Sequence, residues 1–293
     1  MAAKFFRIPS TKTTTQPPRH NESDDGYTSA EEAAKSTVKK MYSIRSLIKQ
    51  SSHAQIYNAV DRKTNQKVIL KRYLKSHFET KELYFTEMAY RICPEYCLPV
   101  SFKQDDKKYF TFVIPKYGMS LYDFMIYRGT VLNLEESKFV FQQVLKCLIK
   151  LQNVGLYHLD IKEENILIDP KTFNIKIIDF GCSSELPIFT KKIVGSKEFC
   201  SPEIISGESH YTNVKKHDVW SLGVTIISAM TGNTPYNKIE DIMTGEEDFE
   251  ILADIDEIFD DELKGILGLM LDLDPERRVS FRKLAKTSFF GGC

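Results

Sequence analysis

The sequence has no excess of charge of either sign and no long apolar run. Lys and Arg total 40, Asp and Glu total 40, and the formal net charge at pH 7 is zero. A neutral balance argues against nucleic acid or an anionic membrane surface as the main ligand. No apolar run approaches the roughly 18 residues of a membrane span, and the first residues lack the apolar core of a secretory signal. We therefore expect a protein with no membrane span.

Cysteine is scarce for a fold held together by disulfides. The chain has 6 cysteines in 293 residues, which excludes a disulfide scaffold. Cys93 and Cys97 are separated by three residues, but no second Cys/His pair stands nearby to complete a tetrahedral zinc site. We expect free thiols in a reducing compartment.

Length and composition predict a globular protein of two domains, or one domain of two lobes. The chain is 42% hydrophobic and 27% charged, which is ordinary for such proteins. Residues 1–40 differ, because they are rich in Ser and Thr and have little apolar periodicity. We predict a disordered N-terminal arm there, with a tether or a phosphorylation target as the alternative to a solvated tail.

Hydrophobic periodicity predicts a β-rich first part and a helical second part. In the helix expected at 133–151, Val140, Val144 and Leu148 recur four residues apart, and Asn133 with Glu136 has the spacing of a capping box. Strands are predicted at 42–48, 55–60, 68–73, 108–114, 166–168 and 175–178, and further helices at 79–92, 218–230 and 261–271. This order indicates an α+β fold.

The densest polar pattern follows the helix at 133–151. Residues 157–165 read YHLDIKEEN, Asp179-Phe180-Gly181 comes next, and Ser201-Pro202-Glu203 follows. Together with Lys71 upstream and DVWSLG at 218–223, these motifs resemble those of the eukaryotic protein kinase family in order and spacing. The resemblance covers about residues 42–290.

The resemblance implies a bilobal protein kinase fold at 41–290. A small β-rich N-lobe with one main helix is expected at about 41–114, a hinge at 115–118, and a larger helical C-lobe at 119–290. The implied activity is that of an ATP-dependent protein kinase. A lysine two residues after Asp160, here Lys162, resembles the pattern of Ser/Thr kinases rather than that of tyrosine kinases. Ser196 also resembles the pattern of Ser/Thr kinases.

The catalytic roles follow the demands of phosphoryl transfer, which needs alignment and charge neutralisation. By resemblance, Asp160 is the catalytic base and Lys162 stabilises charge on the transferred phosphoryl group. Asp179 and Asn165 are expected to hold Mg²⁺, with Mn²⁺ as the alternative ion, because these cations prefer oxygen ligands. Lys71 is expected to pair the α- and β-phosphates of ATP.

A helix carboxylate is expected to hold Lys71. Glu87 is predicted for this role and Glu82 is the fallback, while a solvated helix charge is the alternative for Glu87. The Pro115 carbonyl is expected to accept from the adenine amino group, since proline keeps its carbonyl, and the Tyr117 N–H is expected to donate to the ring. The full predicted adenine pocket consists of Ile48, Ile56, Ile69, Ile114, Pro115, Tyr117 and Leu167.

Three further carried-over positions are structural. Glu203 is expected to pair with buried Arg278 and so anchor the substrate-facing loop. Asp218 is expected to hydrogen-bond the backbone of the catalytic loop.

The sequence departs from the family pattern at the nucleotide loop and the catalytic loop. Lys49, Ser51 and Ala54 stand where glycines usually let the backbone approach phosphate, and Ile69 replaces a small alanine. Leu159 replaces the arginine that usually receives an activation-loop phosphate. We therefore predict an activity that does not require that phosphorylation.

Two functions remain open: an active Ser/Thr protein kinase, and a pseudokinase that acts by contact as a binding or scaffold module. Residues 161–167 are similar to PIM-type kinases, which prefer basic protein substrates, and Glu164 is expected to meet a substrate arginine. A solvated loop charge is the alternative for Glu164. The domain also looks like kinases of large DNA viruses. We expect an intracellular site of action in cytoplasm or nucleus, of the host cell if viral; the oligomeric state stays open.

Overall fold

A computed structural model describes eight ranges of the chain: 37–51, 54–77, 80–104, 109–185, 188–189, 195–206, 212–235 and 259–292. These residues form two compact units. The first comprises the described parts of Met1–Glu79 and Val100–Lys116, and the second those of Thr80–Pro99 and Tyr117–Cys293. The second break between the units follows Lys116, inside the predicted hinge at 115–118.

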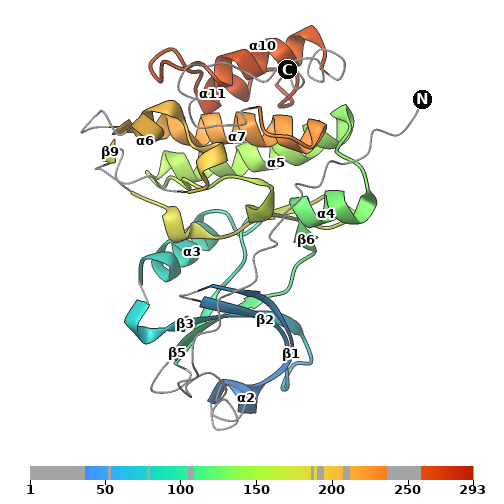
Figure 1. Cartoon of the computed structure of the whole chain (residues 1–293), viewed down its shortest axis with the longest axis vertical. Coiled ribbons are helices and arrows are strands. Elements are labelled where there is room, and N and C mark those ends of the chain that lie inside the picture. Colours follow the sequence, from blue (N-terminus) through green and yellow to red (C-terminus); the bar gives the residue numbers. More distant parts are fainter. Residues whose placement is uncertain are drawn as a thin grey trace, which may run out of the picture. The chain divides into compact units, whose positions relative to one another are not determined.

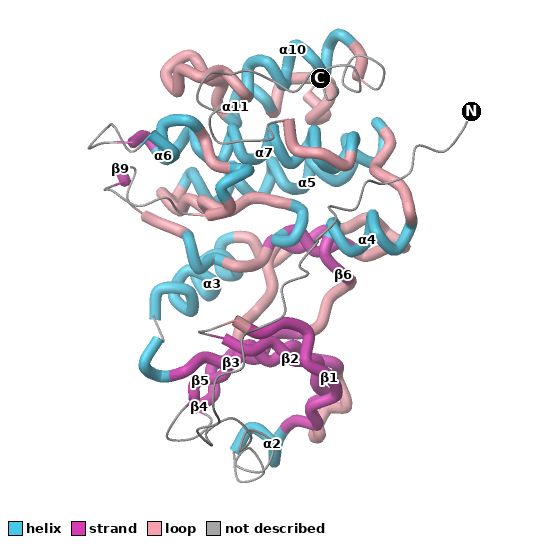
Figure 2. Tube along the Cα trace, viewed as in Figure 1, coloured by secondary structure: helices cyan, strands magenta, loops and turns pink. Residues whose placement is uncertain are grey.

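The first unit is built on a five-stranded antiparallel sheet with strand order β1-β2-β3-β5-β4 (Figures 1 and 2). The strands are β1 (Tyr42–Gln50), β2 (Ala54–Asp61), β3 (Lys67–Leu74), β4 (Ser101–Gln104) and β5 (Tyr109–Pro115). The four strands predicted in this part of the chain are confirmed, apart from residue 108, which lies outside the described residues. β4 was not predicted.

Alternation along the strands places the core of the first unit on one face of the sheet. On β3, Val68, Leu70 and Arg72 are buried while the residues between them are more exposed. The short helix α2 (Thr37–Met41) contacts both β1 and β4. The hydrophobic core of the first unit contains a cluster of buried residues: Val38, Tyr42, Ala59, Val68, Leu70 and Val113. Residues 37–40, assigned to the arm from sequence, are thus helical, because Val38 is buried in this core. Residues 1–36 lie outside the described part.

The second unit is mostly helical. Its α-helices are α3 (Thr80–Ile92), α4 (Leu121–Arg128), α5 (Leu134–Asn153), α6 (Pro202–Ser206), α7 (Val214–Thr231), α10 (Asp261–Met270) and α11 (Phe281–Leu284). Helix α7 packs against α4, α5 and α10, and α11 packs against α5 (Figure 1). Within the described ranges, no helix combines the length and apolarity that crossing a bilayer requires.

Short strands and 3-10 helices connect these helices. One sheet has the order β6-β7-β8, and β9 pairs with β10. Their bounds are β6 (Met119–Ser120), β7 (Ile166–Ile168), β8 (Ile175–Ile177), β9 (Ile188–Phe189) and β10 (Thr212–Asn213). The 3-10 helices are η2 (Lys75–His77) in the first unit, and η3 (Glu163–Asn165), η4 (Phe180–Cys182) and η5 (Lys197–Phe199) in the second. The predicted α+β class is confirmed.

Helix α5 forms as its sequence predicts. The Asn133 side chain accepts from the Glu136 N–H at 3.0 Å, and the Glu136 carboxylate accepts from the Asn133 N–H at 3.0 Å, which completes the capping box. Val140, Val144 and Leu148 are all buried. This helix leads directly to the segment that carries the densest polar motif.

Helix α3 lies in the second unit, although residues 80–99 were placed in the small lobe from sequence. Its packing explains the difference. Phe85 and Ala89 are buried, and the helix contacts η4 and α5. α3 is therefore placed against the segment that follows Asp179.

Candidate active site

Asp218 holds the catalytic-loop backbone. Its Oδ2 accepts from the His158 N–H at 2.9 Å, and its Oδ1 accepts from the Leu159 N–H at 2.8 Å. Asp218 is buried on α7, and Leu159 has a left-handed φ of 66°. The predicted role of Asp218 is confirmed. The two bonds fix the loop immediately before Asp160.

The Asp160 carboxylate is held on both oxygens. Its Oδ1 accepts from the Ser196 N–H at 2.9 Å, and its Oδ2 accepts from the Asn165 side-chain amide at 2.8 Å. The Lys162 ammonium lies 3.1 Å from Oδ2 and also donates to the Ser196 hydroxyl. Three residues from two separate segments therefore converge on one carboxylate.

Gly195 allows the second of these segments to approach the loop. A Cβ at this position would lie 2.6 Å from the Leu159 carbonyl oxygen and 3.1 Å from Asp160 Oδ1, and the φ of Gly195 is +86°. The Cβ of any other residue would therefore collide with the Leu159 carbonyl oxygen. Glycine is therefore required here for Ser196 to reach Asp160.

Lys162 carries its positive charge in a half-buried place. Burial opposes the charged ammonium, but the Asp160 carboxylate, through its charge and its hydrogen bond, outweighs that effect and raises the pKa of Lys162. The side chain is therefore cationic at neutral pH. It can neutralise negative charge that develops beside Asp160.

The oxygen donors of Asp179 and Asn165 fit a magnesium ion. The Asn165 Nδ2 donates to the Asp160 carbonyl at 2.7 Å and to its Oδ2 at 2.8 Å, so these bonds leave the amide oxygen for another partner. Asp179 precedes η4 in a left-handed conformation. Among the described residues, no cluster of three His, Cys, Asp or Glu could hold a metal alone. One carboxylate and one amide suit Mg²⁺, which is usually completed by substrate phosphates and water.

The structure places Glu82, but not Glu87, beside the segment that follows Asp179. A Cβ on Gly181 would lie 3.6 Å from Glu82 Oε2 and 3.4 Å from Asp179 Oδ1, so Glu82 faces the Asp179–Gly181 segment. The Glu87 carboxylate instead lies 4.0 Å from the Arg91 guanidinium, on an exposed part of the helix. Helix phase thus turns Glu87 away from that segment, and which of the two carboxylates holds Lys71 stays a prediction.

In the first unit, strand pairing groups four predicted nucleotide residues. Lys71 pairs with Ile56 of β2, and Ile69 pairs with Ile114 of β5. Cross-strand partners share a face, and residues two apart on a strand share it too. Ile56, Ile69, Lys71 and Ile114 therefore lie on one face of the sheet, opposite the buried face of β3.

The other predicted adenine-pocket residues have more varied settings. Ile48 falls within an irregularity of the β1–β2 pairing between Leu47 and Lys49, and its side chain is exposed. Pro115 ends β5, and Leu167 lies in the middle of β7. The Tyr117 hydroxyl donates to the Asn174 carbonyl at 3.0 Å. Their roles toward a nucleotide stay predictions.

The hairpin between β1 and β2 closes without the usual glycines. The Ser51 N–H donates to the Ala54 carbonyl at 2.8 Å, and the Ala54 N–H donates to the Ser51 hydroxyl at 3.1 Å. Residues 52–53 lie outside the described part. The hydrogen bond to the Ser51 hydroxyl thus helps to hold the two ends of this turn together.

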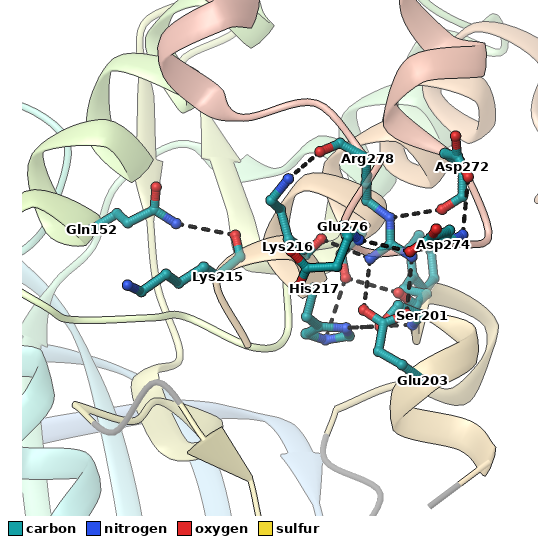
Figure 3. Close-up of polar contacts among 12 residues, drawn as sticks. Gln152, Ser201, Glu203, Lys215, Lys216, His217, Asp272, Asp274, Glu276 and Arg278 are labelled. Atoms are coloured by element: carbon teal, nitrogen blue, oxygen red, sulfur yellow. Dashed lines mark hydrogen bonds and ion pairs between the residues drawn. The ribbon is translucent and has the colours of Figure 1, made fainter. Parts of the chain in front are cut away.

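Glu203 and Arg278 form the predicted buried pair (Figure 3). Arg278 also donates to the backbone carbonyls of Asp272 and Lys216, both at 3.0 Å. Burial alone raises the pKa of Glu203, but the hydrogen bonds and charge of Arg278 outweigh it and lower the pKa. The predicted anchor of the 201–203 segment is confirmed.

The buried polar residues near the loop that were missed from sequence include Glu163, Ser201 and His217. Burial raises the pKa of Glu163 to about 7. His217 directs its ring toward Ser201 (Figure 3). A histidine beside Asp218 at the start of an otherwise apolar helix was the available signal, but the partner segment lies elsewhere in the chain.

Comparison of the sequence with known proteins assigns the chain to one family. The profile described as "Protein kinase domain" matches residues 42–290. The Saccharomyces cerevisiae serine/threonine-protein kinase PSK2 is 30% identical over 176 residues, which cover 58% of this chain and 16% of that protein. The mouse PAS domain-containing serine/threonine-protein kinase is 29% identical over 188 residues, 62% of this chain and 13% of the relative.

A plant relative shows the same level of similarity. The Arabidopsis thaliana SNF1-related protein kinase catalytic subunit alpha KIN12 is 29% identical over 189 residues, which cover 61% of this chain and 36% of the relative. The matched segments are therefore well under half of the length of each of these three relatives.

Proposed function

Because the chain belongs to the protein kinase domain family, we propose that it is a Ser/Thr protein kinase that transfers the γ-phosphate of ATP to hydroxyl groups of protein substrates. The observation that carries this proposal is the fixation of both Asp160 oxygens by Ser196 and Asn165, with Lys162 beside them. Two of the three named relatives are described as serine/threonine-protein kinases, which supports the substrate class.

Asp160 acts as the base that accepts and orients the proton of the attacking hydroxyl. The Ser196 N–H and the Asn165 amide fix its carboxylate before a substrate arrives, so little reorganisation is needed during the reaction. Lys162 stays protonated and stabilises charge on the transferred phosphoryl group. Positioning and charge neutralisation are the two requirements of phosphoryl transfer.

Asp179 and Asn165 supply the oxygen ligands for a divalent ion, Mg²⁺ or Mn²⁺. When bound with ATP, such an ion neutralises phosphate charge. Lys71 pairs the ATP phosphates, and Glu82 replaces Glu87 as the functional carboxylate of α3. The adenine is received by the predicted residues, with the Pro115 carbonyl and the Tyr117 N–H as the polar contacts.

Protein substrates with basic segments remain the predicted partners. Glu164 is exposed beside the catalytic loop, which supports a charge pair with a substrate arginine. The free thiols of the described cysteines agree with a reducing compartment, and a site of action in cytoplasm or nucleus stays a prediction.

One observation favours the second function, a pseudokinase that acts as a binding or scaffold module. The turn after β1 has side chains at Lys49, Ser51 and Ala54 where glycines usually approach phosphate, and Ser51 ties that turn to Ala54. The complete set of groups around Asp160 is the stronger argument and favours the kinase. Loss of the loop glycines impairs only the positioning of phosphate. The groups around Asp160 suit proton transfer and charge neutralisation, which a scaffold does not need.

Transfer of radiolabel from γ-labelled ATP to myelin basic protein or histone tests the proposal, first with Mg²⁺ and then with Mn²⁺. Asp160→Asn should lower the rate by about 10²- to 10⁴-fold, the usual range for loss of a general base. Asp261→Asn is the matched control, since the Asp261 side chain is fully exposed on α10, and it should keep the parent rate.

Thermal shift with ATP separates the two functions, because a ligand that binds only the folded state raises its stability. Stabilisation by ATP without any label transfer would favour the pseudokinase. An Asp160→Asn protein that transfers label as fast as the parent would assign the activity to a contaminant.

A further inference from the structure

His217 links the 199–203 segment to helix α7. The side chain is buried near the start of α7, directly after Lys216 and directly before Asp218. The Lys216 carbonyl accepts from Arg278, which holds Glu203, and Asp218 holds the catalytic-loop backbone. His217 therefore stands in sequence between the residue that helps anchor Glu203 and the residue that anchors the catalytic loop; its position near Ser201 and Glu203 is seen in Figure 3.

Both ring nitrogens of His217 face polar groups of buried serines. Nδ1 lies 3.3 Å from the Ser201 backbone N–H and 2.9 Å from the Ser201 hydroxyl oxygen. Nε2 lies 3.5 Å from the Ser221 hydroxyl oxygen, and that hydroxyl donates to the Phe199 carbonyl at 2.8 Å. The ring thus contacts Ser201 of the 199–203 segment directly. It reaches Phe199 of the same segment indirectly, through the Ser221 hydroxyl.

These contacts fix the protonation state of the ring. The Ser201 backbone N–H can only donate, so Nδ1 must accept and carries no proton. The proton of a neutral ring is then on Nε2, which lies near the Ser221 hydroxyl, and the ring also hydrogen-bonds the Leu159 backbone. A second proton on the ring would set Nδ1–H against the Ser201 N–H and leave that buried amide without its acceptor, which is costly.

We propose that His217 is a positioning residue for protein substrates: its neutral imidazole holds the 199–203 segment in the binding conformation, and protonation of the ring weakens binding of the protein substrate without weakening that of ATP. This proposal rests on the proposed kinase function. It adds an acid-sensitive control of substrate affinity at a residue outside the Asp160 network.

The electrostatic surroundings of the ring agree with a neutral form. Burial lowers the pKa of His217, and it outweighs the neighbouring carboxylates of Asp218 and Glu203, which raise it. Arg278 lowers it further. Two other sets of charged groups lie nearby. Lys216, on the same helix, donates to the Arg278 carbonyl. Lys197 and Glu198 of η5 are exposed.

The sign of the effect follows from this shift. A histidine whose folded pKa is lowered stays neutral in the folded protein at a pH where the unfolded chain begins to take up a proton, at about 6.5. The contribution of the contact is complete above that pH. It declines as the pH falls below about 6.5 and is lost once the folded ring is protonated.

The steady-state KM for myelin basic protein between pH 8 and 5.5 tests the proposal, with the KM for ATP measured in parallel. In the parent, the protein KM should rise several-fold as the pH falls from about 6.5 toward the lower pKa of the folded ring, while the ATP KM changes little. His217→Asn places an amide oxygen where Nδ1 stands and cannot be protonated, so its protein KM should stay near the parent's neutral value and lose the acid-dependent rise.

His217→Leu cannot accept from Ser201, and its protein KM should be raised at every pH. Lys215→Ala is the matched control, because this neighbour on α7 has an exposed side chain; it should follow the parent curve. A His217→Asn protein with the same acid-dependent rise as the parent would overturn the proposal, and so would a His217→Leu protein with the parent's KM throughout.

A measurement without catalysis separates this inference from the proposed function. The free energy of unfolding in urea should fall more steeply with acid below about pH 6.5 in the parent than in His217→Asn. If the parent shows this difference but transfers no label, the proposed kinase function and the substrate part of the inference fail together, while the Ser201 contact stands. Equal acid dependence in both proteins would overturn the contact itself.

Discussion

Arg278 and Glu203, 75 residues apart in the chain, form a bidentate ion pair in the interior of the second unit. Arg278 Nη1 lies 2.6 Å from Glu203 Oε1, and Nη2 lies 2.9 Å from Oε2. The Arg278 side chain is fully buried, and the Glu203 side chain is only 10% exposed. The pair therefore ties the segment after Cys200 to the loop before α11.

Removing one partner of this pair should destabilise the protein strongly. Arg278→Ala leaves a buried carboxylate without compensation, which costs about 3–5 kcal/mol. Arg277→Ala is the matched control, because Arg277 is 71% exposed and forms surface ion pairs with Asp272 and Asp274; it should cost at most about 1 kcal/mol. Urea denaturation measures both. Equal losses in the two variants would contradict a special role for the buried pair.

The same pair predicts an acid dependence of stability. Because the pKa of Glu203 is lowered in the folded state, its contribution is complete above the unfolded value of about 4.3 and is lost as the pH falls through the lower, folded value. Glu203→Gln removes the charge with little change of shape. The difference in unfolding free energy between parent and variant should therefore shrink below about pH 4.3, and a constant difference would refute this.

Glu82 and Glu87 offer a matched pair of substitutions on α3. Glu82→Gln removes the carboxylate that faces the Asp179–Gly181 segment and should lower kcat/KM by about tenfold or more, equivalent to about 1.4 kcal/mol. Glu87→Gln removes only a weak exposed contact with Arg91 and should leave kcat/KM within about twofold. Label transfer under identical conditions measures both, and the reverse ranking would restore the assignment made from sequence.

Activity should not depend on activation-loop phosphorylation. Leu159 is buried in an apolar cluster with Tyr157 and Val214, against which Cys182 packs, so the position usually occupied by a phosphate-binding arginine is filled by hydrocarbon. Treatment with a phosphatase, with removal of phosphate verified by mass spectrometry, should leave the rate of label transfer nearly unchanged. A collapse of the rate after treatment would show that phosphate is received elsewhere.

Local sequence patterns predicted the elements well where the controlling interactions span a few residues. The capping box of Asn133 and Glu136 and the four-residue spacing of Val140 and Val144 determine α5 within its own length. Alternation along β3 likewise determines which of its faces is buried. The motif at 158–165 indicated candidate catalytic residues through family resemblance, before any contact was known.

Helix α2 shows where local patterns fail. Thr37–Met41 is too short to form alone, and it is helical because Val38 is buried against strands β1 and β2 and residues further along the chain. The orientation of Glu82 and Glu87 could not be read from sequence for a related reason. Both are acidic residues on one helix, and only the packing of α3 against η4 decides which of them faces Asp179.

The sequence by itself determined the fold class, the family and the identity of the groups around Asp160, since these depend on short-range patterning and on motifs readable in order. Tertiary structure alone decided which carboxylate of α3 is turned to the site and that His217 meets Ser201. The direction of a buried side chain depends on packing between segments distant in the chain, and neither propensity nor spacing along the chain encodes that packing.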